Sequence, residues 1–191
     1  MARSLDSARF FVALLPPQAV QDKITTIKQD IWQRFNSKAA LESPPHITLQ
    51  PPFQWPLGQV DELAQQLATF AQTQGHVPIG LEGFNVFAPR VLYIDVAKTS
   101  QLMSIQPALL TSLETGCGVV DRVAQSRSFV PHVTVGFRDL LPAAFQEAWG
   151  DYRDRSFAAD FVVQNLTLLC HDGQVWQVFS EFPLLARGSV T

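Results

Sequence analysis

The chain has 191 residues, of which 47% are hydrophobic and 16% are charged, and its formal net charge is −3. This composition is typical of a globular protein and excludes a disordered chain. A net negative charge also excludes an overall basic field for holding long nucleic acid, so we expect a small partner, or one that is engaged only locally.

Apolar residues at every third or fourth position predict helices, whereas alternation or a short continuous apolar run predicts a strand. Pro17 can open the first helix, since a proline in the first turn loses no hydrogen bond. In chain order, the first part of the sequence predicts a strand at 9–15, a helix at 20–35, a loop to 45, a strand from 46, a helix at 60–70 and strands at 77–87 and 91–97.

The second part of the sequence repeats this order. A helix is predicted from Leu102 to Leu113, with Ser100 as a candidate cap. A loop at 116–128, a strand from 132 and a short helix at 142–149 follow, and then come two strands, at 157–169 and 175–184, joined by a turn at 171–173. The two halves therefore predict related lobes, and because no flexible linker separates them we expect a single domain over residues 1–191.

One motif occurs twice, as Pro45-His46-Ile47-Thr48-Leu49 and as Pro131-His132-Val133-Thr134-Val135. The two copies are 86 residues apart and take up two of the four histidines in the chain. Alternation predicts that each copy is a strand, with histidine and threonine on one face and the apolar residues in the core. Two edge strands that merely expose polar faces would be the structural alternative.

Two histidines beside two hydroxyls are suited to displacement at phosphorus. A neutral imidazole can take a proton from the attacking group, and a charged imidazole can give one to the leaving oxygen. Thr48 and Thr134 could donate to phosphate oxygens, where negative charge is concentrated. No cluster of acidic residues accompanies either motif, so we expect no metal and no cofactor. Cys117 remains an alternative nucleophile, but no histidine is near it in the sequence.

Residues that follow or flank the motifs are candidates for substrate contacts. Phe53, Trp55 and Phe137 could stack on a base, with packing as the alternative. Arg127 and Arg138 flank the second strand and could meet a substrate phosphate, with a solvated surface position as the alternative.

The paired motifs resemble those of the two-histidine (2H) phosphoesterase superfamily, which includes the 2′,5′-RNA ligase-like proteins and the RNA 2′,3′-cyclic phosphodiesterases. The resemblance covers nearly the whole chain. It implies an α+β fold with two pseudo-symmetric lobes, each with an antiparallel sheet and helices, around a central cleft without metal. It also implies that His46 protonates the leaving 3′-oxygen, that His132 activates water, and that Thr48 and Thr134 hold the phosphate.

We therefore expect a phosphodiesterase that hydrolyses a 2′,3′-cyclic phosphate on a nucleotide or RNA end to a 2′-phosphate, with 2′,5′-ligation as the reverse reaction. The residues that follow the motifs, Gln50 to Phe53 and Gly136 to Asp139, resemble a less characterised branch of the superfamily, which leaves the substrate open. Alternatives are 2′,5′-oligoadenylate or ADP-ribose cyclic phosphate as substrate, and a non-catalytic module that binds phosphate ends.

The sequence also bears on where the protein works. The apolar run at 10–15 ends at Pro16-Pro17 and is too short for a signal peptide, and no run of membrane-spanning length follows. Cys117 and Cys170 lack the spacing of a metal or redox motif and fit reduced thiols. We expect a cytoplasmic monomer that does not engage a membrane.

Overall fold

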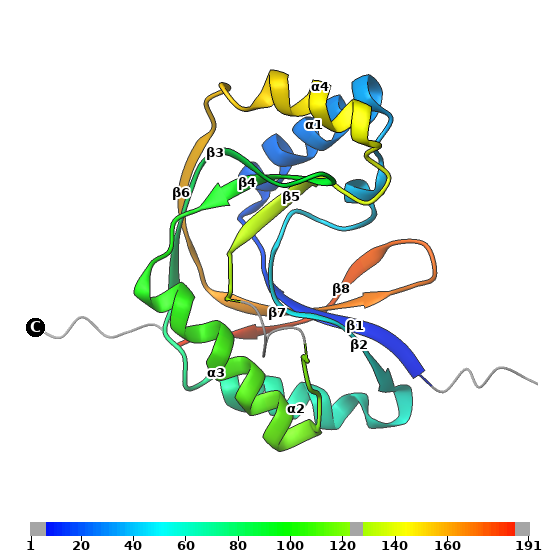
Figure 1. Ribbon diagram of the computed structural model, residues 1–191. Helices are drawn as coiled ribbons and strands as arrows, with labels where there is room; N and C mark the ends of the chain where they lie inside the picture. The colour runs from blue at the N-terminus through cyan, green and yellow to red at the C-terminus, as the bar shows by residue number, and fades with distance from the viewer. Residues whose placement is uncertain (1–6, 123–127, 186–191) are drawn as a thin grey trace, which may run out of the picture.

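The computed structural model describes residues 7–122 and 128–185 (Figure 1). This part of the chain forms an α+β fold, as expected from the sequence. Its strands are β1 (Ser7–Leu14), β2 (Ile47–Pro56), β3 (Val77–Phe87), β4 (Val91–Val96), β5 (His132–Gly136), β6 (Ala158–Val163), β7 (Asn165–His171) and β8 (Trp176–Pro183). Its α-helices are α1 (Gln18–Phe35), α2 (Val60–Ala71), α3 (Ser100–Cys117) and α4 (Pro142–Tyr152).

The strands form two antiparallel sheets, with the orders β2-β1-β7-β8 and β5-β4-β3-β6. The first sheet takes its strands from the two ends of the chain, and the second takes its strands from the middle. The two lobes are therefore not the two halves of the sequence. Both motif strands, β2 and β5, are edge strands, and Pro51 and Pro52 can be accommodated in β2 because an edge strand has one side without ladder hydrogen bonds.

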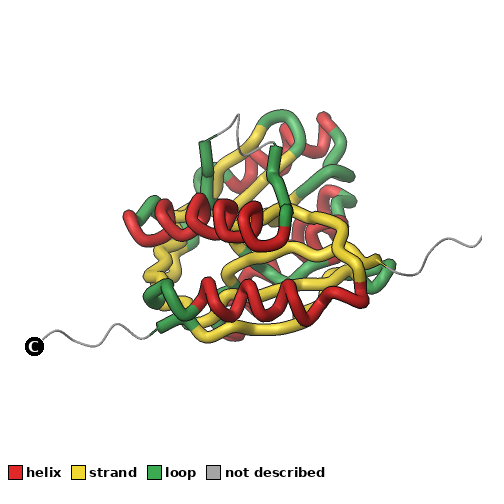
Figure 2. The backbone as a smooth tube through the Cα atoms, turned by 90° about the horizontal axis from the view of Figure 1, so that it is seen from below, coloured by secondary structure: helices red, strands yellow, loops and turns green. Residues whose placement is uncertain are grey.

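Each long helix between two paired strands packs on the opposite lobe. Helix α1 connects β1 to β2 of the first sheet, yet it contacts β5 and α4 of the second lobe. Helix α3 connects β4 to β5 of the second sheet, yet it contacts β2 and α2 in addition to β3 of its own sheet. As a result, α1 and α4 cover one lobe and α2 and α3 the other (Figure 1). Figure 2 shows two long helices side by side in front of the strands when the molecule is seen from below.

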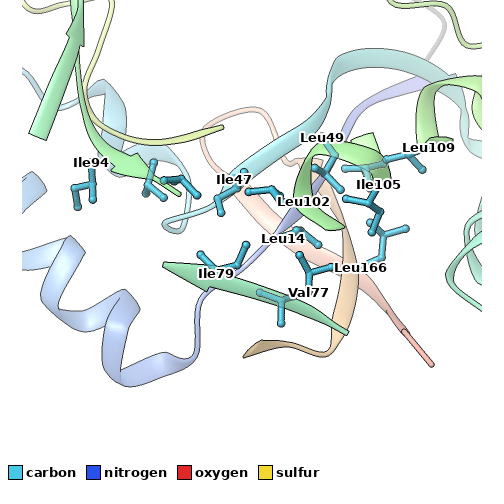
Figure 3. Close-up of a cluster of buried hydrophobic side chains, with 14 of the residues drawn as sticks. Leu14, Ile47, Leu49, Val77, Ile79, Ile94, Leu102, Ile105, Leu109 and Leu166 are labelled. Carbon is cyan, nitrogen blue, oxygen red and sulfur yellow. The ribbon is translucent and has the colours of Figure 1, made fainter. Parts of the chain in front are cut away.

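A continuous core of buried side chains joins the two lobes. Each fully buried aliphatic side chain contributes about 1.5–3 kcal/mol relative to an exposed one, so this shared core holds the two sheets in a definite relative position. The part of the core drawn in Figure 3 combines residues of both sheets and of α3, among them Leu14, Ile47, Leu49, Val77, Ile79, Ile94, Leu102, Ile105, Leu109 and Leu166.

Two local predictions were wrong. The run predicted as one strand at 157–169 is two strands, β6 and β7, which end and begin on either side of Gln164 and join different sheets. A continuous apolar run indicates that both faces of a strand are buried, but it does not show which sheet the strand joins. The cap of α3 is Thr99, whose hydroxyl accepts a hydrogen bond from the backbone N–H of Leu102 at 3.3 Å, and Ser100 is the first helical residue.

None of the helices in the described ranges combines the length and apolar character that a membrane crossing requires.

Candidate active site

Both motif strands place their apolar residues in the core and their polar residues on the opposite face. Ile47 and Leu49 of β2 are 1% exposed, and Val133 and Val135 of β5 are fully buried. The alternating residues His46, Thr48, His132 and Thr134 line one pocket of about 600 Å³ between the two sheets. The pocket is formed across the gap between the two edge strands, which also contact each other directly.

The two imidazoles are anchored in the same way. Nδ1 of His46 lies 2.7 Å from the carbonyl oxygen of Pro44, and Nδ1 of His132 lies 2.8 Å from that of Val130. A carbonyl oxygen only accepts, so Nδ1 carries the proton in both rings and Nε2 is the atom available for proton transfer. In each motif the anchoring carbonyl belongs to the residue two positions before the histidine, which is why the two sites match.

The electrostatic surroundings of the two histidines differ. The pKa of His46 is lowered to about 4, mainly by burial and to a smaller extent by the nearby charges of Lys28 and His132, against the hydrogen bond to Pro44, which raises it. Burial also lowers the pKa of His132, but there the hydrogen bond to Val130 and the carboxylate of Asp95 both act to raise it. Without substrate, both rings are therefore neutral at pH 7.

Aromatic side chains pack against the ring of His46. The ring of Phe11 in β1 lies with its centroid 4.7 Å from that of His46, and Trp176 of β8 packs edge-on against Phe11 at 4.6 Å. Both Phe11 and Trp176 line the pocket. They come from parts of the sequence far from either motif, so sequence analysis did not identify them.

The ring of His132 is likewise held between aromatic side chains. Phe87 of β3 meets it edge-on at a centroid distance of 4.9 Å, and Tyr93 of β4 lies at 5.1 Å. Phe87 lines the pocket and is 38% exposed. These contacts limit rotation of the imidazole and reduce the access of water to it. The register that pairs Tyr93 with Thr134 could not be read from the sequence.

Two of the five predicted substrate contacts line the pocket. Phe137 is 40% exposed there, and Arg138 forms an ion pair with Glu42, which lines the same pocket. Arg138 also lies over the ring of Phe137 at 5.7 Å from its centroid. The predicted contact Arg127 lies outside the described residues.

Phe53 and Trp55 do not line the pocket, so the structure corrects this prediction. Phe53 packs toward the core, with its ring 6.4 Å from that of Phe10. Trp55 is 9% exposed, and its indole N–H donates to the carbonyl of Gln59 at 2.8 Å. Both residues are an even number of positions from Ile47, so alternation along β2 places them on the core face.

The polar groups that line the pocket are the two imidazoles, serine and threonine hydroxyls, the Gln106 amide, the Asp121 carboxylate and the ion pair of Arg138 with Glu42. Within residues 7–122 and 128–185, no three His, Cys, Asp or Glu side chains come together as a group that could hold a metal ion. Cys117 is not among the residues that line the pocket, and burial raises the pKa of its thiol, so it is a poor nucleophile at neutral pH.

The chain belongs to the 2′-5′ RNA ligase superfamily, whose family model matches residues 16–175. This confirms the resemblance noted from the two motifs. Among similar sequences, a candidate phosphoesterase of Geobacillus thermodenitrificans is 27% identical over 185 residues, which are 95% of this chain and 99% of that protein. A candidate phosphoesterase of Bacillus mycoides is 28% identical over 176 residues, which are 91% and 95% of the two chains.

Solved structures show the same fold. Escherichia coli LigT in complex with 3′-AMP superposes with a TM-score of 0.70 at 16% identity, over 94% of this chain and 99% of LigT. A protein of Thermus thermophilus superposes with a TM-score of 0.64 at 17% identity, over 94% of this chain and the whole of that chain. The α+β fold with two lobes is thus the fold of LigT.

Proposed function

We propose that the protein is a metal-independent phosphodiesterase that opens a 2′,3′-cyclic phosphate on a nucleotide or an RNA end and leaves a 2′-phosphate. One observation carries the proposal: two His-x-Thr pairs, on edge strands of different sheets, line a single pocket with both Nδ1 atoms anchored. Membership of a superfamily named for 2′-5′ RNA ligases supports this choice of chemistry. LigT binds 3′-AMP, ATP and NADP⁺ in its crystal structures, and this supports a nucleotide as the substrate class.

In the proposed reaction, water attacks phosphorus and the bond to the 3′-oxygen breaks. Nε2 of His132 takes the proton of the water, and Nε2 of His46 gives its proton to the departing 3′-oxygen. Each of these transfers is worth about 10²–10⁴ in rate. Thr48 and Thr134 donate to the non-bridging oxygens, where fixed donors stabilise the negative charge of the transition state.

The lowered pKa values of His46 and His132 fit a site in which the bound substrate promotes protonation of an imidazole. The bound phosphodiester is an anion, and a nearby anion favours the protonated form of an imidazole. Entry of the substrate therefore raises the pKa of His46 from the low value of the empty pocket. The same anion would meet Arg138 at the rim, where Glu42 already neutralises part of the positive charge.

The first experiment incubates the protein with 2′,3′-cyclic mononucleotides and with a short RNA ending in a 2′,3′-cyclic phosphate, in excess chelator. We expect turnover to a 2′-phosphate, and we expect His46→Ala and His132→Ala to lower kcat at least about 100-fold. His76→Ala is the matched control, because His76 is not among the pocket-lining residues. Full activity in either site variant refutes the acid–base assignment.

A second experiment separates the two roles. A p-nitrophenyl phosphodiester has a leaving group that needs no protonation, so it should rescue a variant that lacks the general acid. We expect this substrate to restore much of the rate in His46→Ala but not in His132→Ala. Rescue of His132→Ala alone would exchange the two roles, and a linear 2′,5′-linked dinucleotide in the same assay tests the alternative substrate.

A further inference from the structure

A lysine occupies the buried stripe of α1. The stripe consists of Ile24, Lys28, Ile31 and Phe35, at the spacing that makes one face of a helix. Lys28 is only 2% exposed, whereas lysine is almost never fully buried without a partner of opposite charge. Helix α1 packs against the second lobe, so this face of the helix lies inside the molecule.

The ammonium group of Lys28 has a single hydrogen-bond partner among the described residues. Its Nζ donates to the carbonyl oxygen of Ser43 at 3.0 Å, and no carboxylate of the described chain lies within ion-pair distance. Burial without a counter-ion lowers the pKa of Lys28 to about 7. A buried cation with one neutral acceptor destabilises the folded protein, so its presence calls for a reason other than stability.

The partner of Lys28 lies directly before the first catalytic motif. Ser43 lines the pocket, and the next carbonyl along the chain, that of Pro44, is the one that anchors Nδ1 of His46. Two consecutive carbonyl groups therefore accept hydrogen bonds, that of Ser43 from Lys28 and that of Pro44 from His46. The 3.0 Å hydrogen bond from Lys28 fixes the backbone directly before the Pro44 carbonyl, which is the group that accepts the hydrogen bond of the His46 ring.

We propose that Lys28 is a positioning residue for His46, which holds the Ser43–Pro44 backbone in place at the expense of stability. The proposal rests on the catalytic role proposed for His46. The positive charge of Lys28 acts on the imidazole as well, since it is one of the two nearby charges, with that of His132 on β5, that disfavour the protonated ring. Lys28 does not line the pocket and is not a catalytic residue.

The test compares Lys28→Met with Lys23→Met, which removes an exposed lysine of the same helix. Lys28→Met should keep or raise the thermal midpoint while kcat for the cyclic phosphate falls at least tenfold and KM changes less than threefold. The limb of the pH–rate profile that reports His46, and the NMR titration of its ring, should move to higher pH. Lys23→Met should match the wild-type protein in all five quantities.

Wild-type kcat with an unchanged titration of His46 in Lys28→Met would overturn the proposal. Failure of Lys28→Met to fold would overturn it too, because the lysine would then be kept for stability. The ring titration and the thermal midpoint need no turnover. A wild-type protein that is inactive on every cyclic phosphate, but whose His46 still shifts in Lys28→Met, would refute the proposed function alone.

A second inference concerns the amide of Gln106 in α3. Gln106 lies among the buried residues Leu102, Ile105, Leu109 and Leu113 of the helix and is 8% exposed. It lines the pocket, and its side chain has no hydrogen-bond partner within the described ranges. The amide atoms of Gln106 keep contact with solvent, since Gln50 Oε1 is the one fully buried side-chain N or O atom without a partner in the described chain, so this amide is open to a ligand in the pocket.

The pocket that Gln106 lines also has apolar walls. Leu49 and Phe129 line the same pocket and provide apolar contacts. A glutamine amide presents a donor beside an acceptor, and this pattern is complementary to the edge of a nucleobase. We infer that Gln106 reads the base of the substrate, an assignment that deepens the proposed function and rests on it.

The test measures kcat/KM of Gln106→Leu on the four 2′,3′-cyclic mononucleotides and on glycerol 1,2-cyclic phosphate, which has no base. The preferred nucleotide should lose at least tenfold and the base-free substrate less than threefold, with Gln101→Leu on the same helix as control. An equal effect on all substrates would overturn the inference. If the wild-type protein hydrolyses none of them, the proposed function fails, and weaker binding of 3′-AMP by Gln106→Leu still tests the base contact by itself.

Discussion

Lys28 should give the protein an unusual dependence of stability on pH. Its pKa is 10.5 in the unfolded chain and about 7 in the folded protein, because burial disfavours the charged form. Between these values the unfolded state binds one more proton, so the free energy of unfolding rises as pH rises and is lowest below pH 7. Integration of this difference from pH 7 to pH 9 gives about 2 kcal/mol from this one group.

The assay is urea-induced unfolding of the wild-type protein and of Lys28→Met at pH 7, 8 and 9, in reducing buffer. The thiols of Cys117 and Cys170, whose pKa values burial raises, titrate equally in both proteins and cancel in the comparison. Lys28→Met should be more stable than the wild-type protein at pH 7, and its advantage should shrink by about 2 kcal/mol by pH 9.

Parallel stability curves would refute this reasoning. They would mean that the ammonium group has the same proton affinity in the folded and unfolded chains, and hence that water or a carboxylate reaches it in solution. The inferred positioning role would then lose its energetic argument, although the hydrogen bond to Ser43 could still be tested through kcat.

Three further outcomes are expected. Leu49→Ala should lower the free energy of unfolding by about 3 kcal/mol, since Leu49 is 1% exposed in the shared core; a loss below about 1 kcal/mol would contradict this packing. Asp139→Ala should lower the free energy of unfolding in urea by about 2 kcal/mol, whereas Asp154→Ala, at an exposed position, should change it by almost nothing. The reason is that Asp139 accepts hydrogen bonds from the Ser37 hydroxyl at 2.7 Å and from the backbone N–H groups of residues 38 and 39 at 2.8 and 3.0 Å. Acidification from pH 7 to pH 5 should remove about 2 kcal/mol of stability through His46, because its folded pKa of about 4 lies below the unfolded value of 6.5, and His46→Ala should lack this part of the loss.

Much of the site could be predicted because strand alternation is a local property. The spacing of His46 and Thr48, and of His132 and Thr134, places each pair on one face whatever the rest of the chain does. The same rule, applied further along β2, would have placed Phe53 on the core face with Ile47. The error there lay in treating nearness in sequence to the motif as nearness to the pocket.

Other parts of the fold could not be predicted, because they depend on contacts between distant segments. The apolar run at 157–169 shows that both faces are buried, but only packing decides that it divides at Gln164 between two sheets. Trp176 and Phe11 come together because β8 and β1 both pair with β7. No local pattern contains that information.

The sequence by itself determined the two motif strands, the face that each presents, and the family to which the chain belongs. Only the tertiary structure decided that α1 crosses to the opposite lobe, where Lys28 is buried behind the loop that carries His46. The physical reason is one of range: side-chain periodicity follows from backbone geometry within a few residues, whereas strand pairing and helix placement follow from burying one core common to both sheets.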